Sequence, residues 1–269
     1  MSMVQMVLIF LIGLCAGLTT SLTGASAVMI TVPILSLLLH FSMLQAIGTS
    51  LMVDTLASVF ISYTYYKHGN TDVKSGIWVI LGSIIGAQLG VMIAVLHVPE
   101  RSLGGLFGVF LIIMGAAMWR QGLNKEVIAC RFGNTLHFKN HYYQITASMI
   151  LGFFVGVITG MLGAGGGIMI LLILIFILKF SLQKAIGTST FMMAITALSG
   201  TTGYGYQGEL NILVGLILAS GAVAAGIIGA KFANRVKEDI LTKVAAVIFI
   251  GLGVTMLMFC LYEWNRIIL

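Results

Sequence analysis

The segment Gly17-Leu-Thr-Thr-Ser-Leu-Thr-Gly-Ala25 interrupts an apolar run, and a related segment, Gly156-Val-Ile-Thr-Gly-Met-Leu-Gly-Ala164, interrupts another. A second matching pair follows, Ala46-Ile-Gly-Thr-Ser50 and Ala185-Ile-Gly-Thr-Ser189. The shift along the chain that takes Gly17 to Gly156 also takes Ala46 to Ala185, so one constant shift aligns both pairs without a gap. The chain is therefore predicted to consist of two related halves, each with a polar, glycine-rich break.

The composition is that of an integral membrane protein. The 269 residues are 59% hydrophobic and only 8% charged, whereas soluble domains carry roughly 25% charged residues. The apolar runs are long enough for membrane-spanning helices, and the alternating pattern of a membrane β-barrel is missing. The net charge of +6 lies in the loops, so it does not indicate nucleic-acid binding. We expect an all-α protein surrounded by the lipid bilayer.

Each half is expected to contain five apolar segments, including broken or half-length helices. They run roughly over 3–22, 27–39, 43–66, 75–98 and 102–119 in the first half, and over 143–162, 167–178, 183–206, 210–230 and 241–262 in the second. These segments predict a first transmembrane repeat over 1–119, a polar linker over 120–142 and a second transmembrane repeat over 143–269.

If each apolar segment crosses the membrane, most of the basic residues fall on the same side of it. One side has only Arg101 and Arg266, and the other has Lys67, Lys74, Arg120, Lys125, Arg131, Lys139, Lys179, Lys184, Lys231, Arg235, Lys237 and Lys243. Basic loops favour the cytoplasm, so the linker is expected there and both termini outside. The first two segments of each half either span the membrane or form a re-entrant hairpin. Either way each half crosses an odd number of times, which predicts inverted-topology repeats.

The two breaks place helix starts at membrane depth. A helix start presents free N–H groups and a partial positive charge, and glycine lets an anion approach closely. We therefore predict a site for a small anion that needs no basic side chain. The residues expected to face it are Thr23, Gly24, Ala25 and Ser26 with Gly163, Ala164, Gly165, Gly166 and Gly167.

Other small and hydroxyl residues have competing interpretations. Thr49, Ser50, Thr188 and Ser189 are expected to line the same cavity, or else to cap their own helices. Close helix packing is the alternative interpretation of the breaks. It is the expected role of the scattered glycines Gly82, Gly86, Gly90, Gly221, Gly226 and Gly229.

Asp54 is the one acid within a predicted span, and ionisable residues at membrane depth mark functional sites. It is a candidate to carry a coupling proton, or a structural acceptor for a neighbouring hydroxyl. Its counterpart in the second half is Met193. No metal site, cofactor or catalytic residue is expected, because the histidines and cysteines lack metal spacing and no Ser/His/Asp set lies within the spans. The protein is not expected to be an enzyme.

Three classes of function remain open on these residues. Two related halves with interrupted helices are typical of secondary transporters that work by alternating access. Thr201-Thr-Gly-Tyr-Gly205 resembles the selectivity filter of a potassium channel, which makes an ion channel with a pore near these residues one alternative. A membrane assembly subunit without transport activity is the other.

The segments Gly156–Gly167 and Ala185–Ser189 resemble the sulfite exporter TauE/SafE family of bacterial membrane transporters, and the resemblance covers roughly residues 5–262. The first-half copy departs from it, because Ser26 replaces a glycine of the second copy. The resemblance implies export of a small sulfur-containing anion (sulfite, sulfoacetate or thiosulfate) across the cytoplasmic (inner) membrane. A proton or a counter-anion is an optional coupling partner, and the oligomeric state is left open.

Overall fold

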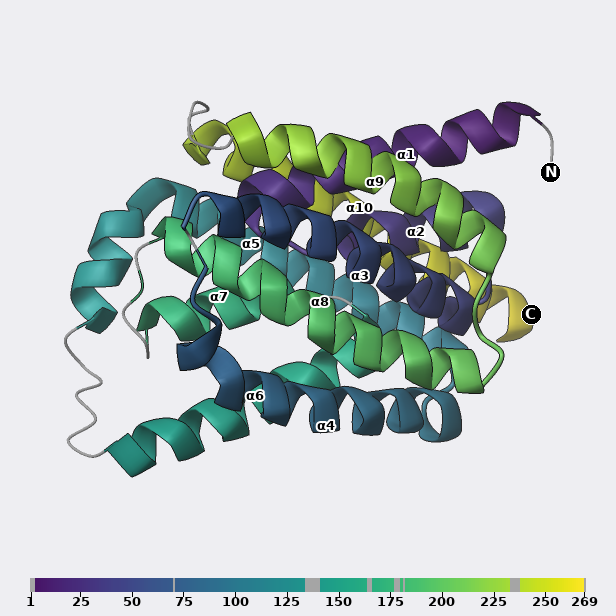
Figure 1. The fold of residues 1–269 in the computed structure, drawn as a ribbon. Coiled ribbons are helices and arrows are strands. Elements are labelled where there is room, and N and C mark those ends of the chain that lie inside the picture. The colour runs from purple at the N-terminus through teal and green to yellow at the C-terminus, as the bar shows by residue number, and fades with distance from the viewer. Residues whose placement is uncertain are drawn as a thin grey trace.

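The structure is a computed structural model that describes residues 3–69, 71–133, 141–163, 166–176, 180, 182–232 and 238–268. These residues form ten α-helices and no strand, so the predicted all-α fold is confirmed. The helices are α1 (Met3–Thr23), α2 (Val28–Leu39), α3 (Met43–Lys67), α4 (Val73–His97), α5 (Glu100–Gly133), α6 (His141–Leu162), α7 (Gly166–Phe176), α8 (Leu182–Tyr206), α9 (Ile212–Phe232) and α10 (Glu238–Ile268). Figure 1 shows them as one bundle.

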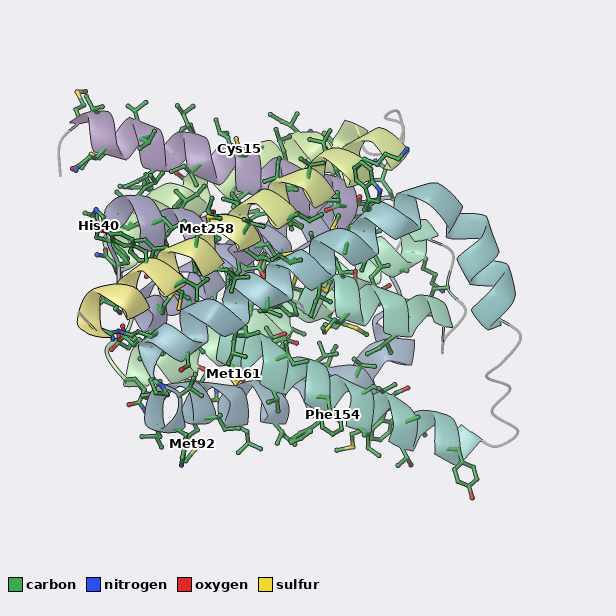
Figure 2. All side chains as sticks on the ribbon, turned by 180° about the vertical axis from the view of Figure 1, so that it is seen from behind. Cys15, His40, Met92, Phe154, Met161 and Met258 are labelled. Atoms are coloured by element: carbon green, nitrogen blue, oxygen red, sulfur yellow. The ribbon has the colours of Figure 1, made fainter. Side chains whose placement is uncertain are left out.

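Seven of the helices are long and apolar enough to cross a membrane: α1, α3, α4, α5, α6, α9 and α10. Their outer faces carry large exposed hydrophobic side chains, such as Met92, Phe154 and Met258, which point outward in Figure 2. An apolar surface of this extent suits lipid rather than water. The chain is a multi-pass membrane protein. Helix α8 is as long as α3, but its many threonine, serine and glycine residues make it less apolar.

Helices α2 and α7 are too short to span a bilayer. They contain 12 and 11 residues, which at 1.5 Å per residue is about 18 and 17 Å, against a hydrocarbon core of about 30 Å. Each folds back on the helix before it. The start of α1 and the end of α2 therefore lie at one end of the bundle, and the start of α6 and the end of α7 at the other (Figure 1).

Contacts between the halves occur in pairs related by the constant shift seen in the sequence. Helix α1 packs on α9 as α6 packs on α4, and α3 packs on α9 as α8 packs on α4. The hydroxyl of Thr49 accepts the N–H of Asn211 at 3.0 Å, and the hydroxyl of Thr188 accepts the N–H of Asp72 at 3.0 Å. The start of α3 thus lies beside the end of α8, and the start of α8 lies beside the end of α3. These equivalent helices therefore run antiparallel.

Glycines allow the paired helices to approach at backbone distance. A Cβ atom added at Gly156 in α6 would overlap the carbonyl of Ser83 in α4, and one at Gly17 in α1 would overlap that of Ala222 in α9. The predicted packing role of the scattered glycines is confirmed, because added Cβ atoms would collide with a neighbouring helix at Gly82, Gly86, Gly90, Gly221, Gly226 and Gly229.

The predicted linker is partly helical. Helix α5 continues to Gly133, well into the segment 120–142 that the sequence analysis set apart as a polar connection. The residues after Trp119 include good helix formers such as Arg120, Gln121 and Lys125, and polarity excludes such a segment from lipid without preventing a helix. Residues 134–140 lie outside the described part of the chain.

The glycine contacts predict a position-dependent cost of adding a methyl group. Gly86→Ala should lower the free energy of unfolding by about 1–3 kcal/mol, because the new Cβ overlaps the carbonyl of Phe153. Gly251→Ala in α10 is the matched control, since nothing lies within 4 Å of its added Cβ. Thermal unfolding in detergent checks both, and equal melting temperatures for the two variants would contradict the packing argument.

Candidate functional site

Both breaks have the same backbone geometry. Gly24 and Gly163 adopt left-handed φ angles of 71° and 73°. Their N–H groups donate to the carbonyls of Thr20 and Thr159 at 3.0 and 2.7 Å, which ends α1 and α6. Glycine is the residue that adopts this conformation without strain. The chain can therefore reverse at each break and begin a short helix within the protein interior.

The two breaks lie in contact with each other. A Cβ atom on Gly167, at the start of α7, would overlap the carbonyl oxygen of Gly24. In the reciprocal contact, Gly163 lies against the side chains of Val28 and Ile47. Ala25 is fully buried in the same region. The starts of α2 and α7 therefore meet, although they come from different halves of the chain.

The start of α2 already holds a carboxylate. Asp54, which is 1% exposed, accepts a hydrogen bond from the hydroxyl of Ser26 at 2.8 Å and another from the N–H of Ala27 at 2.9 Å. The hydroxyl of Ser26 also accepts the N–H of Val28 at 3.3 Å. The expectation that Asp54 accepts from a neighbouring hydroxyl is thus confirmed. Its role as a proton carrier stays a prediction.

The start of α7 is built differently. Met193 stands at the position equivalent to Asp54, and its side chain lies beside Gly166 and Gly167. The hydroxyl of Thr159 is buried without a hydrogen-bond partner in the described structure, 3.2 Å from where Gly166 would carry a Cβ. Among the described residues, the unpaired hydroxyl of Thr159 therefore lies beside the start of α7, which no carboxylate occupies. The predicted residues Ala164 and Gly165 lie outside the described chain.

The hydroxyl residues predicted to line one cavity are not brought together. Thr49 and Thr188 bind loops at opposite ends of the antiparallel pair α3 and α8. Ser189 donates to the carbonyl of Ile186 at 3.0 Å, and Ser50 is buried without a hydrogen-bond partner among the residues described. Ser50 lies one helical turn before Asp54, and Ser189 one turn before Met193, so each is near one of the breaks.

Thr23 completes the first break, and Thr159 is the site residue that the sequence analysis missed. The hydroxyl of Thr23 donates to the carbonyl of Thr19 at 2.7 Å and accepts the N–H of Ala25 at 3.2 Å. Thr159 lies within the quoted repeat, at the position equivalent to Thr20, so the constant shift between the halves could have identified it. The hydroxyl of Thr20 donates to the carbonyl of Ala16, whereas that of Thr159 is unpaired among the residues described.

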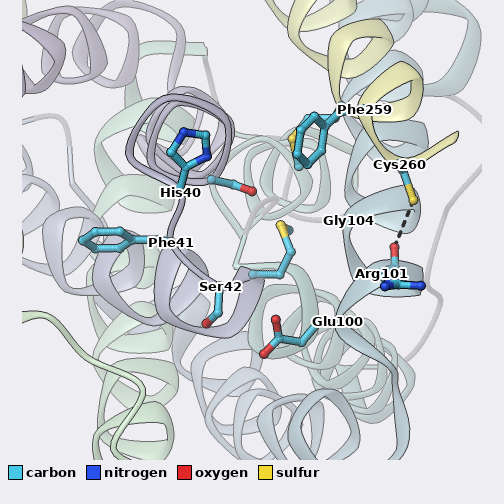
Figure 3. Close-up of a pocket in the computed structure, with 11 residues that line it drawn as sticks. His40, Phe41, Ser42, Glu100, Arg101, Gly104, Phe259 and Cys260 are labelled. Atoms are coloured by element: carbon cyan, nitrogen blue, oxygen red, sulfur yellow. Dashed lines mark hydrogen bonds between the residues drawn. The ribbon is translucent and has the colours of Figure 1, made fainter. Parts of the chain in front are cut away.

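Two pockets are found away from the breaks. One, of about 260 Å³, lies where α2 ends and α5 begins, and Figure 3 shows His40, Glu100 and Arg101 around it. The other, of about 400 Å³, lies between α3 and α8. Neither of these two pockets is lined by a described residue of the breaks. In the loop after α8, burial and the nearby Glu100 carboxylate raise the pKa of the Glu209 carboxyl.

The structure does not support a channel pore near Thr201 to Gly205, because these residues are helical. Helix α8 is continuous through Tyr206, so the backbone carbonyls of Thr201 to Gly205 point along a helix rather than into a pore. The hydroxyl of Thr201 donates to the carbonyl of Ala197 at 2.8 Å, and that of Thr202 to Ser199 at 2.7 Å. A potassium filter instead presents a ring of loop carbonyls.

A helical membrane protein whose interrupted helices meet at its centre has the architecture of a secondary transporter. The family model described as sulfite exporter TauE/SafE matches residues 9–256, and the chain belongs to this family of membrane transporters. The resemblance noted in the sequence is thereby confirmed.

Relatives with transporter names extend over most of the chain. The probable membrane transporter protein YunE of Bacillus subtilis is 25% identical over 261 residues, which cover 92% of this chain and 95% of the relative. YdhB of the same organism is 26% identical, covering 87% and 93%. MJ0441 of Methanocaldococcus jannaschii is 23% identical, covering 93% and 95%. No solved structure matches the chain significantly.

Two tyrosines anchor the helices that precede the breaks, and they predict paired effects on stability. The hydroxyl of Tyr65 donates to the carbonyl of Ser21 at 3.0 Å, and that of Tyr204 to the carbonyl of Gly160 at 3.1 Å. Tyr65→Phe and Tyr204→Phe should each lower the free energy of unfolding by about 1 kcal/mol. The exposed Tyr66 supplies the control, Tyr66→Phe. Denaturant unfolding checks this, and an effect in only one half would contradict the paired anchoring.

Proposed function

We propose that this protein exports a small sulfur-containing anion, of the sulfite, sulfoacetate or thiosulfate class, by alternating access across the bacterial cytoplasmic membrane. The observation that carries the proposal is the start of α7, where a helix N-terminus within the protein interior meets the unpaired hydroxyl of Thr159. Such a site suits an oxyanion, because backbone N–H groups and a hydroxyl supply donors without a buried cation.

The binding residues in this proposal come from both breaks. The hydroxyl of Thr159 and the N–H groups of Gly166 and Gly167 at the start of α7 supply the donors, and Gly163, Ala164 and Gly165 complete the second break as proposed from the sequence. The first break, Thr23 to Ser26, forms the facing wall through the contact between Gly24 and Gly167. Of the four hydroxyl residues proposed from the sequence, Ser50 and Ser189 each lie one helical turn from a break, whereas Thr49 and Thr188 bind loops away from it. Because the two breaks lie in contact, transport in this proposal requires a second conformation in which they separate.

The two halves are proposed to be inverted repeats, 1–119 and 143–269, joined by a cytoplasmic linker over 120–142. The antiparallel packing of α3 against α8 supports this, since equivalent helices of inverted repeats run in opposite directions. Lys67, Lys184 and Lys231 lie at the end opposite the start of α1, which supports a cytoplasmic assignment of that end. Both termini would then lie outside.

Export of an anion needs no second ion in this proposal. The inside-negative membrane potential favours exit by about 2.3 kcal/mol per charge per 100 mV. A proton on Asp54 or a counter-anion stays an optional coupling partner. Flux of sulfite from liposomes that contain this chain alone tests the transporter class. Complete retention of sulfite would favour an assembly subunit instead.

The unpaired hydroxyl predicts opposite changes in stability and binding. Thr159→Val should leave the empty protein at least as stable, because it removes an unsatisfied polar group. The same change should weaken sulfite binding about tenfold or more, since a hydrogen bond to a charged group contributes about 1.5–3 kcal/mol. Calorimetric titration with sulfite and thermal unfolding of the purified protein measure the two effects.

Thr20→Val is the matched control for this prediction, because Thr20 occupies the equivalent position of the first half and its hydroxyl already donates to Ala16. We expect a modest loss of stability and unchanged sulfite affinity. Equal affinity of Thr159→Val and the unchanged protein for sulfite would remove the α7 start from the proposed site.

A further inference from the structure

The two helix starts differ in charge. The start of α2 is occupied by the carboxylate of Asp54, which accepts from the hydroxyl of Ser26 and the N–H of Ala27. Asp54 is the only charged side chain among the buried residues that the structure describes. At the start of α7 the equivalent position is Met193, which has no charge. One start therefore contains a carboxylate that belongs to the chain, and the described residues at the other start supply none.

We infer that Asp54 is a tethered anion that fills the α2 start, so that the protein binds a single free anion, at the start of α7. The binding of that free anion at the α7 start rests on the proposed function, whereas the role of Asp54 at the α2 start does not. Without the Asp54 carboxylate, the α2 start becomes a second site for a small monocarboxylate. Formate matches the head group of Asp54 in charge and shape.

The surroundings of Asp54 consist of donors rather than cations. Ser50 and Ser58 lie one turn before and one turn after Asp54 on the same face of α3. Both are fully buried, and neither hydroxyl has a hydrogen-bond partner in the described structure. Removal of the carboxylate would therefore leave hydroxyls, a free N–H and the positive end of the α2 dipole around an empty space.

Among the side chains that the structure describes, no cation lies where it could neutralise Asp54 in place of the α2 start. Helices α1, α2, α5, α8 and α9 pack against α3. Among their described side chains, the charged groups lie at helix ends: Glu100 and Arg101 on α5, Lys184 on α8 and Lys231 on α9. On α3 itself, Lys67 is at the last position. The partial positive charge of the α2 start is therefore the group that matches the carboxylate.

The first test removes the tethered anion and supplies a free one. Asp54→Ala should melt at a lower temperature than the unchanged protein, because the donors of Ser26 and Ala27 lose their acceptor. Formate should raise the melting temperature of this variant more than that of the unchanged protein, as binding to the folded state requires. Formamide, which has a similar size but no charge, should not. An equal response of both proteins to formate would overturn the inference.

The second test places a tethered anion at the other start. Met193→Asp should weaken sulfite binding by about tenfold or more, because a carboxylate would occupy the α7 start, and Met193→Leu should keep the affinity. Unchanged sulfite affinity of Met193→Asp would overturn the inference. If the unchanged protein does not bind sulfite, the proposed substrate fails, and the formate response of Asp54→Ala still decides the inference. If Asp54→Ala does not fold, the Met193 pair decides it.

Discussion

A backbone that breaks inside a membrane protein must find hydrogen-bond partners within the protein, because lipid supplies none. Here each break finds such a partner within its own half and is covered by a segment of the other half. Gly24 and Gly163 close the helices before them with bonds to Thr20 and Thr159. The carbonyl of Gly24 then lies against Gly167 of the other half. Because each break is covered by the other, neither half can bury its break alone.

This constraint explains why the packing is reciprocal. Helix α9 of the second half covers α1 of the first, and α4 covers α6 in the same way. The close approach depends on glycine in both pairs, since a side chain at Gly17 or Gly156 would overlap a carbonyl of the partner helix. Small residues are the usual means of close helix packing in lipid. A rigid frame of this kind can hold two helix starts at the centre of the molecule.

Within that symmetric frame, the chemistry of the two starts is unequal. Asp54 satisfies Ser26 and Ala27 at the first start, whereas the second has the thioether of Met193 and the unpaired hydroxyl of Thr159. In the proposed arrangement, the carboxylate of Asp54 fills the α2 start and a free anion binds at the α7 start.

The sequence predicted the helical membrane fold and the equivalence of the halves, because hydropathy and a constant shift between matching residues can be read from the chain alone. It also predicted the packing glycines. It did not predict that Thr49 and Thr188 bind loops at opposite ends of the bundle, since that depends on how the halves interlock. The contact of Asp54 with Ser26 and Ala27 was not predicted because it forms within the first half between residues far apart in the chain, where α2 packs on α3. Polarity suggested a linker over 120–142, but polarity does not prevent a helix, and α5 continues to Gly133.

The central claim is that a single free anion binds at the start of α7. Selenite resembles sulfite in charge and shape, and its selenium atom can be located by anomalous X-ray diffraction from crystals of the protein. The account predicts one selenium peak beside Gly166, Gly167 and the hydroxyl of Thr159, with Asp54 still bonded to Ser26 and Ala27. A peak at the start of α2, or binding elsewhere with an empty α7 start, would contradict it.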